Sequence, residues 1–390
     1  MAGTFSRSAE VLVLGGGPGG YMAAIRVGQL GHKPLLVEQG ELGGECLNRG
    51  CIPSKALIHA SHLYHSLRTE GPEIGVTAAD AKFDLGQAMH WKDEVVAKER
   101  QGVASLLKSA GASVLVGTAK FTGPRSADVA APDGGHERID FEQAIIAVGA
   151  VHSTIPGFET DGERVVNAWE LLSLKSLPKS MLVLGGGVSG CELGEFLARV
   201  GVQVSIVELM PQLLPGLEAD LAREVTVGLE KLGVGIRVGT RAVGLKREPD
   251  LLRMAVEGSA GKEELTAERL FVTVGKKPRT KELGLEEAGV VFDPKTGFIS
   301  VDDQMRTNQR HIFAVGDVAR PPMLAHKSYR EGVVAAEAAA GQPTRFQFQA
   351  MPSVVFTTPE LATVGFSKSE AEAHGHSARE ARFPFVALGR

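Results

Sequence analysis

A strand–turn–helix–strand unit occurs twice in this sequence, and this duplication restricts the fold more than any other feature. Each copy begins with a short apolar run, continues through a glycine-rich turn and a helical stretch, and ends in a second apolar run that closes with glutamate. The glutamate follows the first glycine of its turn at the same distance in both copies, from Gly15 to Glu38 and from Gly185 to Glu208. The pattern predicts two βαβ units, each with two buried strands.

Further short apolar runs follow the two copies, and polar or glycine-rich stretches separate them. These runs are residues 113–116, 144–148, 270–274 and 312–315. The alternation of strands and helices predicts an α/β fold with parallel sheets. A chain of 390 residues is too long for one ordinary core, so several domains are expected. The pattern places the domain boundaries so that the segments are 1–150, 151–276, 277–345 and 346–390.

Charge and composition exclude several classes of function. A formal charge of −4 leaves no footprint for nucleic acid or for anionic membrane surfaces. Aromatic residues make up only 5% of the chain, which is too few for a base-stacking platform. The apolar run from Val11 to Leu14 is too short for the core of a signal peptide, and no later run has the length to cross a bilayer. We therefore expect a cytoplasmic protein without nucleic-acid or membrane partners.

The glycines of the two turns suit the binding of dinucleotide phosphates. In such a turn the first glycine permits the bend, the second lets a pyrophosphate approach the backbone, and the third allows close packing of strand and helix. The helix N-terminus supplies N–H donors and the positive end of its dipole. A duplicated structural unit without a ligand is the alternative, but the matched acids favour two bound dinucleotides. The glycines are Gly15, Gly17 and Gly20 in the first copy, and Gly185, Gly187 and Gly190 in the second.

The acid that ends each copy is expected to bind a ribose. Glu38 and Glu208 would each accept a hydrogen bond from a ribose hydroxyl. Glu208 would also repel a 2′-phosphate, and no arginine or lysine occurs between it and Arg223. The second site therefore favours NAD over NADP.

Cys46 and Cys51 follow the first copy closely, so they are expected beside the first dinucleotide. In a regular helix two residues with this separation would lie roughly 8–9 Å apart at Cα, which is beyond disulfide reach. A bridge therefore needs a distorted turn. Gly50 supplies the flexibility, and Pro53 suits the first turn of a following helix. Arg49 and that helix N-terminus would both favour thiolate over thiol, so the pair is interpreted as redox-active.

A zinc half-site and two inert core cysteines are the alternatives for this pair. Zinc usually takes closely spaced cysteines together with a second pair, and the one other cysteine, Cys191, lies alone inside the second glycine motif. Cys191 is interpreted as a small packing residue. His59, His62 and His65 fall at helical spacing, but no carboxylate or cysteine partner is evident, so a solvated helix face is favoured. The sequence therefore predicts no metal site.

Residues 43–55, Gly-Gly-Glu-Cys-Leu-Asn-Arg-Gly-Cys-Ile-Pro-Ser-Lys, resemble the redox signature of the class I flavin-dependent pyridine nucleotide–disulfide oxidoreductases. The match is closest to the dihydrolipoamide dehydrogenase family, and the resemblance runs from about residue 9 to the C-terminus. It implies two Rossmann-like domains, of which 1–150 binds FAD and 151–276 binds NAD. Residues 277–345 would complete the FAD site, and 346–390 would begin an α+β interface domain.

The resemblance also assigns roles to individual residues. Cys46, Cys51, Lys55 and Glu192 would be catalytic, with Lys55 near flavin N5 and Glu192 paired with it. Asp317 stands where the family aspartate bonds the ribityl chain, whereas Val148 replaces a threonine whose hydroxyl contact is lost. The implied NAD contacts are Gly185, Gly187, Gly190, Glu192, Glu208 and Gly275. The implied FAD contacts are Gly15, Gly17, Gly20, Glu38, Gly44, Cys46, Lys55, Thr118, Ala119, Ala147, Val148, Gly149, Asp317, Met323, Leu324, Ala325 and His326.

One departure from the family concerns its catalytic base. The family carries a His-x-x-x-x-Glu pair near its C-terminus, where the histidine reaches across the dimer, and this sequence ends before that segment. His326 with Glu331, and His65 with Glu70, have the spacing but not the matching place, so the base is assigned to no residue. We expect a C-terminally truncated interface domain. A chain that really ends at Arg390 should turn over lipoamide slowly.

The resemblance implies a dihydrolipoyl dehydrogenase that oxidises protein-bound dihydrolipoamide through the cysteine pair and FAD, and reduces NAD⁺. The implied partner is an acyltransferase or carrier protein of a 2-oxo acid dehydrogenase complex or of the glycine cleavage system. The full-length C-terminus would make the protein a homodimer. One alternative is a non-catalytic or diaphorase-only FAD- and NAD-binding redox protein that lacks the base. Another is a reductase of a different disulfide; mercuric ion would need a further cysteine pair.

Overall fold

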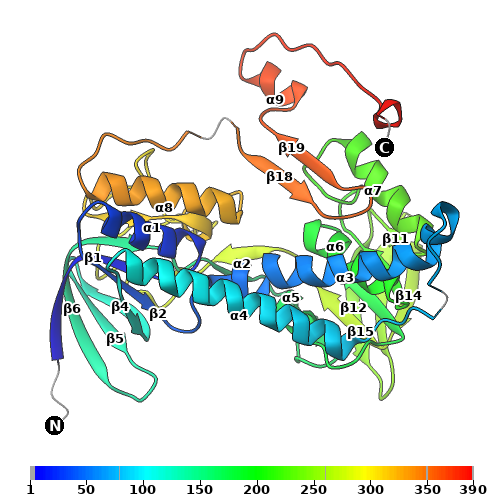
Figure 1. Ribbon diagram of the computed structural model, residues 1–390, viewed down its shortest axis with the longest axis horizontal. Coiled ribbons are helices and arrows are strands. Elements are labelled where there is room, and N and C mark those ends of the chain that lie inside the picture. Colours follow the sequence, from blue (N-terminus) through cyan, green and yellow to red (C-terminus); the bar gives the residue numbers. More distant parts are fainter. Residues whose placement is uncertain (1–4, 79, 260, 348–349, 389–390) are drawn as a thin grey trace.

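The computed structural model contains two lobes, each built on a parallel sheet, and two long helices that connect them along one side (Figure 1). The structure describes residues 5–78, 80–259, 261–347 and 350–388. The first copy of the duplicated unit supplies two neighbouring parallel strands of the first sheet, and the second copy supplies two neighbouring parallel strands of the second. The α/β fold with two Rossmann-like sheets that the sequence predicts is therefore confirmed.

The first sheet has the strand order β3-β2-β1-β6-β5-β4, and β17 also pairs with β6. The pairs β1–β2, β2–β3, β1–β6 and β6–β17 are parallel, whereas β4, β5 and β6 form an antiparallel meander. Residues far apart in the sequence thus complete one sheet. Its strands are β1 (Phe5–Leu14), β2 (Pro34–Glu38), β3 (Ser113–Val116), β4 (Thr118–Gly123), β5 (Ser126–Ala130), β6 (His136–Ile146) and β17 (Ile312–Ala314).

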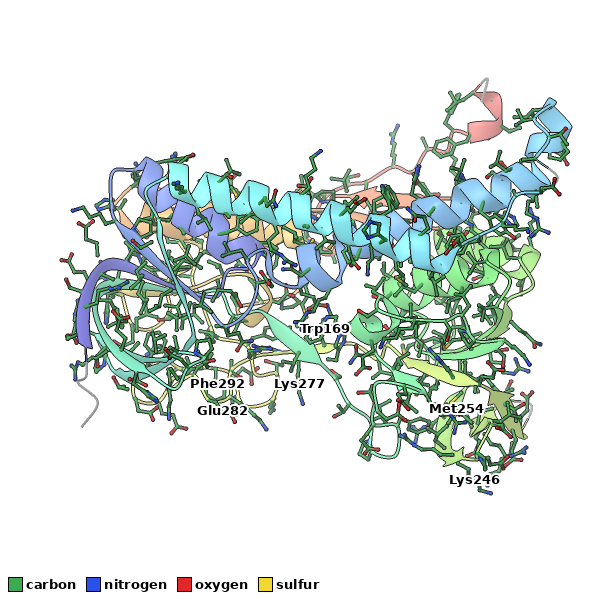
Figure 2. The ribbon with its side chains drawn as sticks, turned by 60° about the horizontal axis from the view of Figure 1, so that its bottom comes forward. Trp169, Lys246, Met254, Lys277, Glu282 and Phe292 are labelled. Atoms are coloured by element: carbon green, nitrogen blue, oxygen red, sulfur yellow. The ribbon has the colours of Figure 1, made fainter. Side chains whose placement is uncertain are left out.

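The second sheet is entirely parallel, in the order β11-β10-β9-β15-β8. A separate antiparallel sheet, β12-β13-β14, packs beside it and carries Lys246 and Met254 (Figure 2). Apolar residues of both sheets form one core, which includes Leu182, Met254 and Leu270. The strands are β8 (Val165–Val166), β9 (Ser180–Leu184), β10 (Gln203–Val207), β11 (Gly235–Arg237), β12 (Arg241–Arg247), β13 (Leu252–Gly258), β14 (Gly261–Ala267) and β15 (Arg269–Val272).

The helices of the first lobe stack on its sheet, with α8 lying directly against α1 (Figure 1). A Cβ atom on Gly332 of α8 would lie 2.3 Å from the carbonyl oxygen of Gly19 in α1, so the two backbones are in direct contact. The helices of the chain are α1 (Pro18–Gln29), α2 (Gly44–Arg49), α3 (Cys51–Thr69), α4 (Leu85–Ser109), α5 (Ala168–Leu171), α6 (Val188–Arg199), α7 (Ala219–Lys231), α8 (Ala325–Ala339) and α9 (Lys368–Ala373), with 3₁₀ turns η1 (Gly71–Ile74), η2 (Gly316–Val318) and η3 (Phe385–Ala387).

The two connections between the lobes run side by side. Strand β7 (Ala150–His152) leads to the second lobe and β16 (Lys276–Pro278) leads back, and they form an antiparallel ribbon in which His152 faces Lys276. The boundaries expected near residues 150 and 276 fall on this ribbon.

Residues 352–364 form a hairpin that packs on the second lobe. Strands β18 (Pro352–Val355) and β19 (Leu361–Val364) are antiparallel, and Val355 and Leu361 belong to the core that surrounds α6. No helix in the described ranges is both long enough and apolar enough to cross a membrane.

Candidate active site

The first glycine turn has the geometry that a dinucleotide phosphate requires. Gly15 has φ of +99°, and a Cβ atom there would lie 2.5 Å from the carbonyl oxygen of Ala147. A Cβ on Gly20 would lie only 1.8 Å from the carbonyl oxygen of Gly15, so the strand–helix contact demands glycine. Gly17 is the N-cap of α1, whose first turn has neither an acidic residue nor a side-chain cap. The N–H groups and the dipole of α1 thus remain available to an anion, which fits a pyrophosphate.

The second turn repeats this geometry. Gly185 has φ of +114°, and a Cβ on Gly190 would lie 2.0 Å from the carbonyl oxygen of Gly185. Nothing lies within 4 Å of a Cβ built on Gly187, the N-cap of α6, so the backbone there is open to an approaching group. The second site therefore fits a dinucleotide on the same grounds as the first.

The two acids have matching hydrogen bonds that sequence reasoning missed. Glu38 accepts from the N–H groups of Gly16 at 2.6 Å and Gly40 at 2.8 Å. Glu208 accepts in the same way from Gly186 at 2.6 Å and Met210 at 2.7 Å. These bonds fix each carboxylate at the end of its strand. An ionised carboxylate has about four acceptor positions, so both acids keep capacity for a ribose hydroxyl.

A cavity of about 1270 Å³ extends from the first turn along the ribbon between the lobes. Trp169, Lys277, Glu282 and Phe292, which Figure 2 labels, are among its lining residues. Most of the FAD contacts expected from the sequence also line it, namely Gly15, Gly17, Glu38, Gly44, Cys46, Thr118, Ala119, Ala147, Val148, Gly149, Asp317, Met323 and Ala325.

The remaining expected FAD contacts do not line this cavity. Gly20 lies beneath the turn, and Lys55 and Leu324 are outside the wall. His326 is exposed, and its Nε2 is 2.7 Å from the carbonyl oxygen of Pro352. Glu331 lies five residues after His326, but its carboxylate accepts hydrogen bonds from Gly316 and Arg320. His326 and Glu331 therefore do not form a pair.

Cys46 and Cys51 lie in contact at the junction of two helices. Helix α2 ends at Arg49, and Gly50 (φ −138°, ψ −107°) breaks the path before α3 begins at Cys51. A Cβ on Gly50 would lie 3.1 Å from the carbonyl oxygen of Glu45, so this close approach favours glycine. The distorted turn expected from the sequence is therefore present, and Pro53 lies in the first turn of α3. Both cysteines are free thiols.

The two sulfurs differ in acidity. The Cys46 thiol donates to Cys51, and this bond, together with the charge of Lys55, lowers the pKa of Cys51 to about 7 against the opposing effect of burial. The same bond and burial raise the pKa of Cys46. Cys51 is also the first residue of α3, where the helix dipole favours a negative charge. In the reduced pair these effects favour a thiolate on Cys51 and a proton on Cys46.

Lys55 forms an ion pair with Glu192 across the two lobes. The Nζ of Lys55, on α3, lies 2.6 Å from an Oε of Glu192, on α6. Glu192 is only 3% exposed, and its other oxygen accepts from the backbone N–H of Phe356 at 2.9 Å. The Phe356 ring centroid is 4.8 Å from the same ammonium. This contact therefore joins three segments that are far apart in the sequence.

A second carboxylate on α6 also holds the C-terminal hairpin. Glu195 accepts from the backbone N–H of Thr358 at 3.0 Å and from Arg199 at 2.7 Å. Burial raises the pKa of Glu195 to about 7, against the opposing charge of Arg199. Arg199 also donates to the Thr358 hydroxyl. The spacing of Glu192 and Glu195 on one helix face was the available sequence signal, but nothing in the sequence linked it to residues near 357.

Cys191 and the three histidines of α3 differ in how deeply they are buried. Cys191 is fully buried, and burial raises its pKa. His59 and His62 are exposed, whereas His65 is partly buried and its pKa is lowered by burial and by Arg199. Within the described ranges, no three histidine, cysteine, aspartate or glutamate side chains cluster in a way that could hold a metal ion.

Comparison with known proteins defines the class. Residues 9–332 match the family described as pyridine nucleotide-disulphide oxidoreductase, and residues 351–390 match the dimerisation domain of that family. The chain therefore belongs to the pyridine nucleotide–disulphide oxidoreductases, and it is an NAD-dependent flavoprotein that uses FAD.

Within the family, several curated relatives that match the whole length of the chain are dihydrolipoyl dehydrogenases. The chain is 44% identical to dihydrolipoyl dehydrogenase 2 of Haloarcula marismortui, over 100% of this chain and 83% of that protein. It is 41% identical to the dihydrolipoyl dehydrogenase of Bacillus subtilis, over 100% of this chain and 82% of that protein. The crystal structure of LpdA from Mycobacterium tuberculosis superimposes with a TM-score of 0.87 at 27% identity, covering 95% of this chain and 81% of that one. These similarities assign the chain the function of a dihydrolipoyl dehydrogenase.

Proposed function

We propose that this chain oxidises protein-bound dihydrolipoamide with Cys46 and Cys51 as its redox pair, and that FAD lies in the large cavity with NAD at the second glycine turn. The observation that carries the proposal is the contact between the two cysteines at the wall of the cavity. In the overall reaction the two thiols of dihydrolipoamide become a disulfide, NAD⁺ accepts a hydride, and one proton is released. When bound, FAD supplies the relay that passes two electrons from thiols to nicotinamide.

The acidities of the two cysteines support a division of roles. A substrate thiolate attacks the sulfur of Cys46 in the disulfide, and Cys51 leaves as a thiolate. A thiol of lower pKa leaves faster in such an exchange, and the Lys55 charge and the N-terminus of α3 both favour the Cys51 thiolate. Cys46 is then held in a mixed disulfide with the substrate. The second substrate thiolate attacks the substrate sulfur of that bond, so the lipoyl disulfide forms and Cys46 is released. Cys46 then takes up a proton, because its pKa is raised. Cys46 is therefore the interchange sulfur, and Cys51 is the sulfur that stays charged at the cavity.

Lys55 and Glu192 keep a fixed charge arrangement beside the pair. The Lys55 ammonium favours the Cys51 thiolate, and Glu192 fixes that ammonium at 2.6 Å. Glu208 occupies the position where a ribose hydroxyl would be bound, and its charge opposes a 2′-phosphate. These contacts support NAD as the nucleotide of the second site.

The substrate that suits this chemistry is a lipoyl group on a protein. We place it on an acyltransferase or carrier protein of a 2-oxo acid dehydrogenase complex or of the glycine cleavage system. A catalytic rather than structural cysteine pair suits the reducing cytoplasm, where we place the reaction. The match to the dimerisation domain supports a homodimer.

Two serine variants test the roles of the cysteines. Cys46→Ser and Cys51→Ser should each lower lipoamide turnover by at least about a thousandfold, because each removes one sulfur of the exchange. Both should still oxidise NADH with an artificial acceptor. Only Cys46→Ser keeps the Cys51 thiolate, so only that variant should show a long-wavelength absorption band with oxidised flavin. If either variant kept its lipoamide turnover, the proposal would be wrong. If Cys51→Ser rather than Cys46→Ser showed the long-wavelength band, Cys46 would be the charged sulfur at the flavin and Cys51 the interchange sulfur.

A further inference from the structure

Asp317, the residue expected to hold the ribityl chain of FAD, lies in a short 3₁₀ turn that is closed by one backbone hydrogen bond of 3.0 Å, from the Ala319 N–H to the Gly316 carbonyl oxygen. Turn η2 (Gly316–Val318) follows β17 and precedes α8, and both Gly316 and Asp317 line the large cavity. Gly316 has φ of +75°, a conformation that few residues adopt. Burial raises the pKa of Asp317, whereas Lys276 and Lys327 act in the opposite direction. The carboxylate therefore depends on its surroundings for both its place and its charge.

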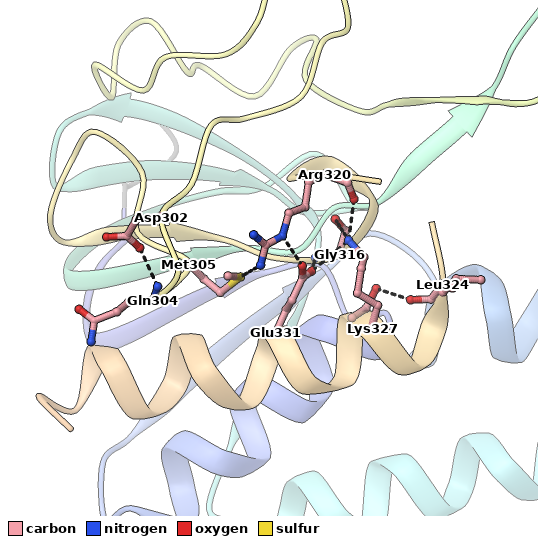
Figure 3. Close-up of polar contacts among 9 residues, drawn as sticks. Asp302, Gln304, Met305, Gly316, Arg320, Leu324, Lys327 and Glu331 are labelled. Carbon is pink, nitrogen blue, oxygen red and sulfur yellow. Dashed lines mark hydrogen bonds and ion pairs between the residues drawn. The ribbon is translucent and has the colours of Figure 1, made fainter. Parts of the chain in front are cut away.

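A buried ion pair on α8 lies directly under this turn. Lys327 and Glu331 are both fully buried, and the Lys327 Nζ lies 3.3 Å from a Glu331 oxygen. The same Nζ donates to the carbonyl oxygens of Arg320, at 2.6 Å, and Gly316, at 3.4 Å (Figure 3). The ammonium of Lys327 thus joins Gly316, the first residue of the turn, to Arg320, which lies two residues after the turn ends.

Glu331 completes the arrangement from the other side. One carboxylate oxygen accepts from the backbone N–H of Gly316 at 2.7 Å, and the other accepts from the Arg320 Nε at 2.9 Å (Figure 3). The N–H and the carbonyl of Gly316 are therefore both bound by side chains of α8. With both groups bound, the peptide planes on either side of this residue have little freedom to rotate.

The same helix also fixes the phosphate end of the site. Gly332, next to Glu331, is the residue at which α8 meets Gly19 of α1. Helix α1 begins at the glycine turn that fits the pyrophosphate. One rigid helix therefore sets the distance between the phosphate turn and the turn that carries Asp317.

A purely stabilising role would not require these charges. Replacing a buried ion pair by apolar residues of similar volume is often neutral or stabilising, because both ions lose their hydration in the protein. The polar atoms of Lys327 and Glu331 instead fix the backbone conformation, because they bond to the backbone on either side of Asp317. We infer that Lys327 and Glu331 are positioning residues that hold Asp317 in the conformation that binds the ribityl chain of FAD. This inference rests on the proposed placement of FAD in the large cavity.

An apolar replacement of the pair tests the inference. The double variant Lys327→Met/Glu331→Leu removes both fully buried charges together, and Arg320, whose side chain is 31% exposed, can be solvated once Glu331 is lost. The protein without FAD should therefore unfold at nearly the wild-type temperature. Its affinity for FAD should fall about tenfold to a hundredfold, as expected for the loss of one well-placed charged hydrogen bond. Titration of the cofactor-free protein with FAD, followed by flavin fluorescence, gives the dissociation constant. The absorption spectrum of the bound flavin should also change.

A milder variant keeps the test decisive if the double variant does not fold. In Lys327→Met alone, Glu331 keeps Arg320 as its partner, while the bonds to the two carbonyl groups are lost. This variant should bind FAD a few-fold to tenfold more weakly. Unchanged FAD affinity in either folded variant would overturn the inference.

Three controls separate the inference from its premise. Lys92→Met also removes a buried ammonium that donates to a backbone carbonyl, that of Leu172 at 2.8 Å, and it should leave FAD affinity unchanged. Asp317→Ala should weaken FAD binding, and if it does not, the premise that Asp317 holds FAD is wrong. A triple variant that adds Asp317→Ala to the double replacement should bind FAD no more weakly than Asp317→Ala alone, because residues that act through one another are not additive. Additive losses would show that the pair acts independently of Asp317, which would overturn the inference.

Discussion

At the scale of single residues, the chemistry depends on one difference between two identical side chains. Cys46 and Cys51 are both thiols, but the first donates a hydrogen bond and the second accepts it. The acceptor also stands at the N-terminus of α3 and near Lys55, so three effects favour its thiolate. The low pKa of Cys51 is therefore built by its position rather than by its residue type.

This difference predicts how alkylation of Cys51 depends on pH. In Cys46→Ser without FAD, the serine hydroxyl can still donate to Cys51, so the alkylation rate should reach half its maximum at a pH below the pKa of an ordinary thiol. In Cys46→Ala the donor is lost, and the midpoint should move up towards the ordinary thiol value of 9.0. The rate of iodoacetamide labelling, measured between pH 5 and 10, gives both midpoints.

Cys191 is the internal control for this measurement. It is fully buried and burial raises its pKa, so it should stay unlabelled while the protein is folded. Equal midpoints in the serine and alanine variants would contradict the role given to the hydrogen bond.

At the scale of secondary-structure elements, glycine sets how closely helices approach. Gly332 allows α8 to touch α1, and Gly20 and Gly190 allow each phosphate helix to touch its turn. Gly102 on α4 differs, because nothing lies within 4 Å of a Cβ built there. Glycine therefore permits a close helix contact in α8, whereas in α4 it only lowers the stability of the helix.

Two matched alanine variants separate these cases. Gly332→Ala would place a Cβ 2.3 Å from a backbone oxygen, so α8 must move and the free energy of unfolding should fall by about 1–3 kcal/mol. Gly102→Ala has no such contact and should raise the free energy of unfolding by about 0.5–1 kcal/mol. Urea unfolding of both proteins measures the two effects. If the free energy of unfolding changed by a similar amount and in the same direction in both variants, the close α1–α8 contact would not be what requires glycine at position 332.

At the scale of the whole molecule, the chain contains one βαβ unit twice, and each copy is proposed to bind one nucleotide. Glu38 and Glu208 end equivalent strands and accept equivalent backbone hydrogen bonds. The cysteine pair and the Lys55–Glu192 contact lie between the two units, where α3 from the first lobe meets α6 from the second. With FAD and NAD in their proposed sites, this arrangement would bring the thiols and both nucleotides to one place.

The duplication predicts reciprocal effects of the two acids. Glu38→Ala should weaken FAD binding about tenfold to a hundredfold while the KM for NADH changes little, because its hydrogen bonds belong to the first site. Glu208→Ala should raise the KM for NADH by a similar factor, narrow the preference for NADH over NADPH, and leave FAD affinity unchanged. Flavin release and steady-state kinetics with both nucleotides distinguish the two outcomes. A loss of FAD in both variants would indicate general destabilisation instead.

Much of the fold and part of the site could be predicted because they depend on neighbours in the sequence. The glycine turns, the strands beside them and the break at Gly50 are local features, fixed by which backbone conformations and close contacts each residue allows. The spacing of the two cysteines likewise requires a distorted turn, because a regular helix would hold them beyond disulfide reach. The family resemblance added Lys55 and Glu192 as a pair, which the structure places 2.6 Å apart.

The sequence by itself determined the two nucleotide-binding units and the cysteine motif, since periodicity, glycine spacing and residue chemistry act over short stretches of chain. Only the tertiary structure decided what His326, Lys327 and Glu331 do, although they lie within one turn and a half of the same helix. His326 turns outward to Pro352, whereas Lys327 and Glu331 turn inward beneath Gly316. Those directions depend on which distant segments pack against α8. Side chains that are buried there must find charged or hydrogen-bonding partners, so the packing decides which groups bond to one another at the site.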